Sequence, residues 1–154
     1  LITSSAASDV YKRQLLGLMS QGAITVVGRP GTHIDTIRAS GLKITGQKEG
    51  VARIAAVDGS AAVKACDAII YVVKTYDTAA ILAATTHIEV RDFAVSLQNG
   101  AVKDELLVET FGRDRVISGV AVVAGERPEP GQISWTPWWD DLVRRNRRLA
   151  IGAG

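Results

Sequence analysis

Apolar residues run without polar interruption through residues 68–73 (AIIYVV), and the run ends abruptly at Lys74. A half-exposed strand would alternate apolar and polar residues, so this run predicts a strand buried on both faces, as strands of parallel sheets are. The threonine and aspartate side chains of residues 75–78 follow, and they can cap a helix over residues 79–84 (AAILAA). Strand, short turn and helix in this order are half of a β-α-β unit.

The same pattern recurs further along the chain. Residues 93–97 (FAVSL) predict a strand, residues 98–100 (QNG) its turn, and residues 102–111 a helix. Residues 116–124 (VISGVAVVA) are another nearly continuous apolar run, which predicts another buried strand. This alternation indicates an α/β fold, with a mostly parallel sheet and flanking helices.

Weaker patterns flank this central part. Residues 42–45 and 51–56 are β-branched segments separated by glycines, and they read as a hairpin or as adjacent edge strands. The remaining elements that we expect are strands at 24–27, 132–135 and 149–151 and helices at 15–21, 33–40 and 60–65.

Composition narrows the function classes. The chain has 154 residues, 47% of them hydrophobic and 22% charged, which is typical of one globular domain. A net charge of +2 is too small to favour nucleic acid or a membrane surface as partner, and no apolar run is long enough to span a bilayer. Cys66 is the only cysteine, so we expect a reducing compartment, the cytoplasm. His33 and His87 have no other metal ligands around them in the sequence, so we expect no metal site.

We expect residues 1–14 to be foreign to the native protein. Residues 4–14 (SSAASDVYKRQ) are the peptide encoded by a transposase adapter used to prepare sequencing libraries. Such segments are excluded from fold reasoning. The chain then divides into a non-native segment, residues 1–14, and an incomplete domain, residues 15–154, that begins inside a helix.

Polar side chains follow three predicted strands at the point where each strand ends: Arg29, Lys74 and Asn99. Because crossovers between parallel strands are right-handed, we expect these strand ends to share one rim, where α/β sheets bind ligands. In dinucleotide-binding folds, an acidic residue after the second strand selects NAD, whereas an arginine accommodates the 2′-phosphate of NADP. Arg29 therefore predicts NADP.

One part of a dinucleotide site is missing. No G-x-G-x-x-G motif precedes Ile24, although a pyrophosphate needs that glycine turn and the helix N-terminus behind it. Since the native part would begin inside a helix, we expect that the first strand and its glycine-rich loop have been lost.

At this point the sequence resembles the ketopantoate reductase (2-dehydropantoate 2-reductase) family. The similarity spans residues 15–152, and its most family-specific parts are residues 73–76 (VKTY) and 97–100 (LQNG). The further matching segments are 26–29 (VVGR), 41–44 (GLKI), 105–106 (EL), 111–112 (FG), 115–120 (RVISGV), 130–131 (PG) and 151–152 (IG).

The resemblance implies a Rossmann-like domain and NADPH-dependent reduction of 2-dehydropantoate to pantoate, on the route to coenzyme A. Arg29 matches the family's contact to the 2′-phosphate. Lys74 and Asn99 match supporting residues near the nicotinamide, its ribose and the substrate, with Asn99 binding substrate. Gly125 falls near a position that contacts the cofactor through its backbone. The family's principal acid, a lysine, lies in a helical C-terminal domain that is absent here, and a homodimer would form through that domain.

Two other functions stay open. A paralogous NADP-dependent reductase of another small 2-keto acid would share this domain, and so would a nucleotide-sensing domain without catalysis. A third, single-stranded nucleic acid binding, would use Trp135, Trp138 and Trp139 beside the arginines of residues 144–148. Asp140 and Asp141 interrupt that cluster, so a solvated loop is the better interpretation. We expect this chain by itself to be inactive.

Overall fold

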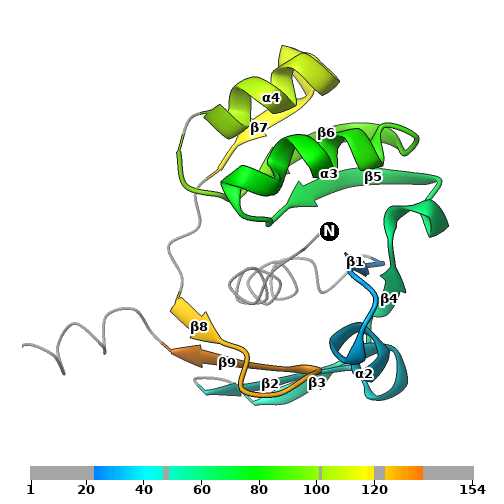
Figure 1. Cartoon of the computed structure of the whole chain (residues 1–154), viewed down its shortest axis with the longest axis vertical. Coiled ribbons are helices and arrows are strands. Elements are labelled where there is room, and N and C mark those ends of the chain that lie inside the picture. The colour runs from blue at the N-terminus through cyan, green and yellow to red at the C-terminus, as the bar shows by residue number, and fades with distance from the viewer. Residues whose placement is uncertain (1–22, 47–48, 101, 120–123, 137–154) are drawn as a thin grey trace, which may run out of the picture.

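The computed structural model of the chain describes residues 23–46, 49–100, 102–119 and 124–136. The described strands form three sheets, with helices packed against them (Figure 1). One parallel sheet contains β5 (Ala65–Tyr71), β6 (Glu89–Ser96) and β7 (Val116–Ser118). A second parallel sheet contains β1 (Thr25–Gly28) and β4 (Ala55–Asp58). The third has the order β3-β2-β9-β8, formed by β3 (Gly50–Ala52), β2 (Leu42–Gly46), β9 (Gln132–Thr136) and β8 (Ala124–Glu126).

β5 is buried on both faces, as its apolar run predicted. Ile69 and Tyr71 belong to one core cluster, whereas Ile70 belongs with Val95 to a second cluster on the other face. The hydrogen-bonded strand covers residues 65–71 and so begins and ends earlier than the predicted 68–73 run. Residues 72 and 73 are buried although they lie beyond the last ladder pair with β6. The predicted parallel sheet is therefore confirmed, with shifted strand ends.

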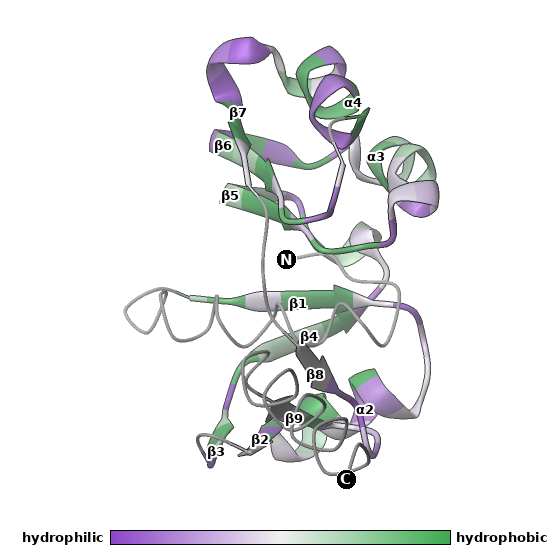
Figure 2. Ribbon diagram, turned by 90° about the vertical axis from the view of Figure 1, so that its left-hand side faces the viewer, coloured by the Kyte–Doolittle hydropathy of each residue, from purple (hydrophilic) through white to green (hydrophobic). Residues whose placement is uncertain are grey.

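Helices α3 (Thr78–Thr85) and α4 (Val102–Phe111) cover the same side of this sheet (Figure 2). Leu82 of α3 and Leu107 of α4 pack into the cluster that contains Tyr71. The Tyr71 hydroxyl lies 2.9 Å from Oγ1 of Thr85, and burial raises the pKa of Tyr71 to about 12, although that hydrogen bond opposes the rise. The helices thus seal one face of β5 and β6.

The second core forms around α2 (Thr32–Ser40). Ile34 and Ile37 of this helix pack against Val26 of β1 and Leu42 of β2. Gly28 allows the close approach, because a Cβ at that position would lie only 2.7 Å from Cγ1 of Ile34. An alanine there would press on the outer part of the Ile34 side chain, so glycine lets β1 pass close to the helix.

The predicted hairpin is only half correct. β2 and β3 pair in antiparallel fashion as expected, with Leu42 opposite Ala52. The segment 51–56 is nevertheless two strands, because β4 starts at Ala55 and pairs in parallel with β1, with Val26 opposite Ala56. Ala56 is buried in the core cluster that α2 packs against. Burial of this residue, and not extension of the hairpin, therefore explains why β4 pairs with β1.

Three further expectations were wrong. The side chains of residues 75–78 do not cap α3; residues 75–77 form the 3₁₀ turn η2 (Thr75–Asp77) instead, and no capping side-chain bond forms. Of the strand expected over residues 116–124, the structure shows β7 up to Ser118, while residues 120–123 lie outside the described residues and Ala124 begins β8 of another sheet. Among the described strands β7 pairs only with β6, and Ile117 is 49% exposed, not buried as expected. The helix expected at 60–65 is only the 3₁₀ turn η1 (Ser60–Ala62), and a third such turn is η3 (Arg113–Arg115).

Other expectations lie outside the described residues. These are the adapter-derived segment 1–14, the helix at 15–21, the strand at 149–151 and the tryptophan- and arginine-containing segment 138–148. Within the part of the chain that is described, no helix is long and apolar enough to cross a membrane.

Candidate functional site

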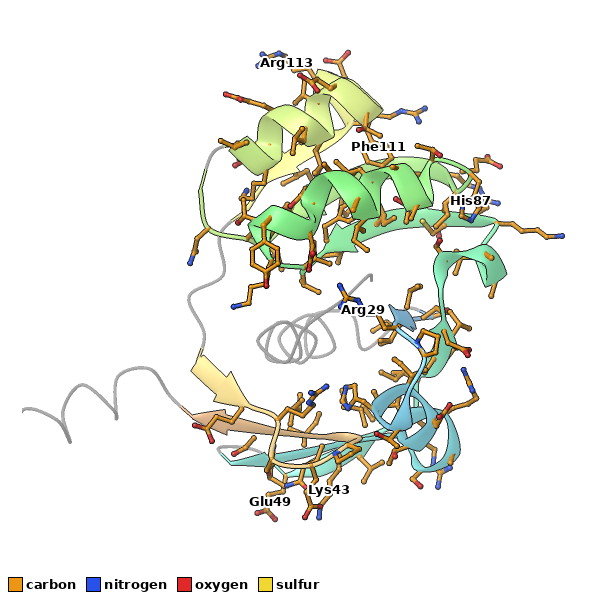
Figure 3. The ribbon with its side chains drawn as sticks, in the orientation of Figure 1. Arg29, Lys43, Glu49, His87, Phe111 and Arg113 are labelled. Carbon is orange, nitrogen blue, oxygen red and sulfur yellow. The ribbon has the colours of Figure 1, made fainter. Side chains whose placement is uncertain are left out.

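Arg29 and Lys74 stand at the carboxyl ends of strands in two different sheets. Arg29 directly follows β1, and its side chain extends toward the sheet that contains β5 (Figure 3). Lys74 is exposed and extended, and it precedes η2. Nη2 of Arg29 lies 3.6 Å from Oδ2 of Asp77 in η2, so the end of β1 contacts the turn that follows β5. Two cationic residues therefore flank one turn.

Asn99 reaches the same turn from β6. The backbone N–H of Leu97 donates to the carbonyl oxygen of Tyr71 at 3.1 Å, which keeps the chain after β6 beside the end of β5. Oγ1 of Thr75 donates to the carbonyl oxygen of Asn99 at 3.3 Å. Gly100 then turns the chain away with φ of 95°, a conformation that favours glycine. Asn99 itself is exposed, so its carboxamide is available to a ligand.

The predicted site residues thus fall into two groups. Arg29, Lys74 and Asn99 all follow carboxyl ends of parallel strands and are joined through contacts to residues 75–77. Gly125 lies elsewhere, in β8 of the four-stranded sheet, where it pairs with Trp135. The structure therefore brings three of the four predicted residues to one rim and leaves the glycine in another sheet.

Sequence reasoning missed a set of buried polar side chains below Asn99. Thr78 and Gln98 are both buried, and Oγ1 of Thr78 donates to Oε1 of Gln98 at 3.0 Å. The hydroxyl of Ser96, also buried, accepts from the backbone N–H of Gln98 at 3.4 Å. Thr78 read as a capping residue and Gln98 as part of a turn, and no local pattern indicates that they bond to each other.

Lys103 was missed as well. It is fully buried in α4, and its Nζ donates to the carbonyl oxygen of Ser96 at 3.3 Å and to the carboxylate of Asp104. Asp104 also accepts from Oγ of Ser118 in β7 at 2.6 Å. Burial tends to raise the pKa of Asp104, but the hydrogen bonds from Lys103 and Ser118 outweigh it and lower the pKa. The one signal in the sequence is that Lys103 lies four positions before the buried Leu107.

Neither His33 nor Cys66 adds chemistry to this rim. Nδ1 of His33 accepts from the backbone N–H of Gly131 at 2.8 Å, which ties the turn before β9 to α2. Burial raises the pKa of the Cys66 thiol, so it is a poor nucleophile. Among the residues that the structure covers, no group of three or more histidine, cysteine, aspartate and glutamate side chains could hold a metal ion.

Among the described residues, the rim therefore offers two cations and a carboxamide, with the Asp77 carboxylate beside them and no group of three or more metal-ligating side chains. A guanidinium binds phosphate in a bidentate manner, and an ammonium lowers the free energy of nearby negative charge. A carboxamide can both donate and accept hydrogen bonds. This set suits a phosphorylated cofactor and a carbonyl that becomes an alkoxide.

The chain is similar in sequence to proteins of one known family. The family model "Ketopantoate reductase PanE/ApbA" matches residues 14–143. A 2-dehydropantoate 2-reductase of Halobacterium salinarum is 30% identical over 137 residues, which cover 85% of this chain and 45% of that protein. One from Pyrococcus abyssi is 29% identical over 113 residues, covering 73% of this chain and 36% of that protein. The chain thus spans less than half the length of these curated relatives.

Solved structures show the same fold. A PanE/ApbA family ketopantoate reductase from Ralstonia eutropha JMP134 superposes with a TM-score of 0.73 at 24% identity, covering 88% of this chain and 46% of that one. A D-mandelate dehydrogenase in a ternary structure with NADH and anilino(oxo)acetate also gives a TM-score of 0.73, at 18% identity, with 88% and 46% covered. At these identities the likeness shows the Rossmann-like fold.

Proposed function

Because this chain belongs to the ketopantoate reductase family, we propose that it is the cofactor-binding part of an NADPH-dependent reductase that converts 2-dehydropantoate to pantoate. The reaction would transfer a hydride from the nicotinamide to the keto carbon of a small-molecule substrate, in the cytoplasm and on the route to coenzyme A. Support comes chiefly from the convergence of three strand ends, because Arg29 and Asn99 both contact the turn at residues 75–77, next to Lys74.

Arg29 is the proposed contact to the 2′-phosphate of NADPH. Its side chain is 69% exposed and extends from the end of β1, where dinucleotide folds place the adenosine ribose. The ion pair with Asp77 is long, at 3.6 Å, and exposed pairs of this kind contribute only about 0–1 kcal/mol. A doubly charged phosphate can therefore compete for the guanidinium.

Lys74 and Asn99 are the proposed supporting groups at the cofactor and the substrate. Hydride addition places negative charge on the carbonyl oxygen, and a nearby cation or donor lowers that barrier. Lys74 would supply positive charge at the rim, and the Asn99 carboxamide would orient the cofactor ribose and the keto acid. Gly125 is proposed to contact the cofactor through its backbone.

The remaining parts of the enzyme are proposed to lie outside the described chain. Within the described residues, β1 pairs only with β4 and β5 only with β6, and β1 and β5 are the strands of the two sheets that face each other (Figure 2). We propose that a first strand with a glycine-rich loop pairs there. A helical C-terminal domain would supply the principal acid, a lysine, and the contact of a homodimer. Residues 1–14 are proposed to be non-native.

A second candidate is reduction of a different 2-keto acid. The observation that favours it is the equal TM-score of the D-mandelate dehydrogenase and of the ketopantoate reductase from Ralstonia eutropha JMP134. A nucleotide-sensing domain without catalysis is the third candidate, because Lys74 and Asn99 are assigned only supporting roles and the principal acid is proposed to lie outside the described residues.

The test is an assay of the full-length protein that carries this domain, with NADPH oxidation followed at 340 nm. The substrates are 2-dehydropantoate, pyruvate, 2-ketoisovalerate and benzoylformate. We expect kcat/KM to be highest for 2-dehydropantoate and higher with NADPH than with NADH. A higher kcat/KM for another keto acid would support the second candidate, and NADPH binding without turnover of any of them would support the third.

A further inference from the structure

Buried polar side chains gather beneath the segment that carries Asn99. Of the buried polar and charged residues that the structure describes, all but Thr85 lie there; they are Thr78, Ser96, Gln98 and Lys103. Buried polar groups lower stability unless they are hydrogen-bonded, so such a concentration at one place needs a physical reason.

Gln98 is the central member of this group. Its side chain is 4% exposed, and Oε1 accepts a hydrogen bond of 3.0 Å from Thr78, the first residue of α3, which is itself 0% exposed. Its backbone N–H is held by Oγ of Ser96. The next residue is Asn99, whose carbonyl oxygen is held by Thr75. Gln98 therefore anchors the chain immediately before the exposed Asn99.

Only the oxygen of the Gln98 side-chain amide is hydrogen-bonded in the described structure. Its Nε2 is buried and has no hydrogen-bond partner, a state that costs roughly 1–3 kcal/mol. A leucine or methionine would fill the same space without that cost. Packing therefore does not explain the amide, whereas a need to fix the orientation of the following residue does.

We propose that Gln98 is a positioning residue for Asn99. Its amide is hydrogen-bonded to Thr78 at the start of α3, which restricts the chain at residue 98 and so would hold the Asn99 carboxamide at the ligand rim. The neighbouring Lys103 bonds the carbonyl oxygen of Ser96 and stiffens the same segment from α4. The placement of Asn99 stands on these contacts alone; its consequence for turnover rests on the proposed function.

The decisive comparison is Thr78→Val against Thr85→Val in the full-length protein. Both threonines lie in α3, both are buried (0% and 1% exposed), and both have bonded hydroxyls. Thr85, however, is the last residue of α3, and its hydroxyl contacts the Tyr71 hydroxyl and not the Gln98 amide. Both variants should lower the melting temperature to a similar extent. Only Thr78→Val should lower kcat, by roughly tenfold or more, with the KM for NADPH within about twofold. Thr78→Ser, which keeps the hydroxyl, should restore kcat.

A second readout needs no turnover. The side-chain amide ¹H–¹⁵N signals of Gln98 and Asn99 should both shift in Thr78→Val and stay in place in Thr85→Val. Equal kcat for the two valine variants, or a shift of the Gln98 signal without one of Asn99, would overturn the proposal. If Thr78→Val does not fold, Gln98→Met carries the kcat measurement and the shift of the Asn99 side-chain amide signal. If the wild type reduces no keto acid, the reductase function fails while the amide signals still decide the positioning role.

Discussion

Nη2 of Arg29 lies 3.6 Å from Oδ2 of Asp77, and this ion pair joins the end of β1 to the 3₁₀ turn that follows β5. Arg29 follows a strand of one parallel sheet and Asp77 lies in the turn after a strand of the other, so the contact directly links the two halves of the rim. It also means that the guanidinium proposed to bind a 2′-phosphate already has a carboxylate beside it. The Arg29 side chain is 69% exposed and that of Asp77 23%, so an anion can reach the guanidinium and compete with the carboxylate.

Asp77→Asn should therefore tighten binding of a 2′-phosphate. Removing the competing carboxylate is expected to lower the Kd for 2′,5′-ADP by roughly fivefold or less, the range of an exposed ion pair, and to leave the Kd for 5′-ADP unchanged. Isothermal titration of the full-length protein measures both. Asp67→Asn, which breaks the exposed pair with Arg91 toward the opposite end of the sheet, is the control. Weaker binding of 2′,5′-ADP to Asp77→Asn would show that Asp77 orients the arginine instead.

Gly28→Ala should destabilise the protein. The added Cβ would lie 2.7 Å from Cγ1 of Ile34, and overpacking of this kind costs about 1–3 kcal/mol. Urea unfolding measures the loss. Ile34→Ala opens the space, so the double variant should be more stable than the sum of the two single effects predicts. Simple additivity would mean that the helix shifts freely and that Gly28 has another role.

Asp104→Asn should lower the free energy of unfolding, because of its effect on the buried Lys103. The lysine would lose its charged partner, and leaving a buried charge unpaired costs about 3 kcal/mol at the lower end of the known range. The exposed Asp92 of β6, changed to asparagine, is the matched control and should cost far less. A loss as small as that of the control would contradict the buried ion pair.

The same carboxylate should make stability depend on acid pH. The pKa of Asp104 is lowered in the folded protein, so the unfolded chain binds this proton more tightly. The stabilisation is complete above the unfolded pKa of about 3.9 and is lost as pH falls through the lower folded pKa. Denaturant midpoints between pH 7 and about pH 3 should therefore fall more steeply for the wild type than for Asp104→Asn. Parallel curves would be contrary to the lowered pKa.

Lys74→Ala and Asn99→Ala should separate binding from turnover. In the full-length enzyme, loss of the Lys74 charge is expected to raise the KM for NADPH by roughly tenfold, the value of a charge-assisted contact. Loss of the Asn99 carboxamide is expected to lower kcat by about 100-fold. Lys64→Ala, an exposed lysine just before β5, controls for the general effect of charge. Unchanged turnover and unchanged NADPH affinity in both variants would reject the assigned roles.

Local patterns predicted the parts of the fold whose burial is decided locally. The apolar run at 68–73 became β5, and the helix over residues 102–111 was confirmed. The ends of strands were less predictable, because Val72 and Val73 are buried without belonging to the ladder. Likewise Ala55 leaves the hairpin to pair with Thr25, a partner that no neighbouring residue indicates.

The candidate site was predictable for its exposed residues only. Arg29, Lys74 and Asn99 could be found because each follows a recognisable strand and is polar. The buried layer below them depends on bonds between distant residues: Thr78 with Gln98, and Asp104 with Ser118. No pattern within one element encodes such pairs, so the sequence predicted only that Thr78 caps α3.

The preference for NADPH over NADH tests the shared rim most directly. The ratio of kcat/KM with NADPH to kcat/KM with NADH should be measured for the full-length wild type, Arg29→Met and the control Arg91→Met, an exposed arginine toward the other end of β6. If β1 ends at the cofactor's ribose, Arg29→Met lowers the ratio by roughly tenfold or more, through weaker NADPH binding, and the control leaves it unchanged. An unchanged ratio in Arg29→Met would contradict a nucleotide site formed by these strand ends.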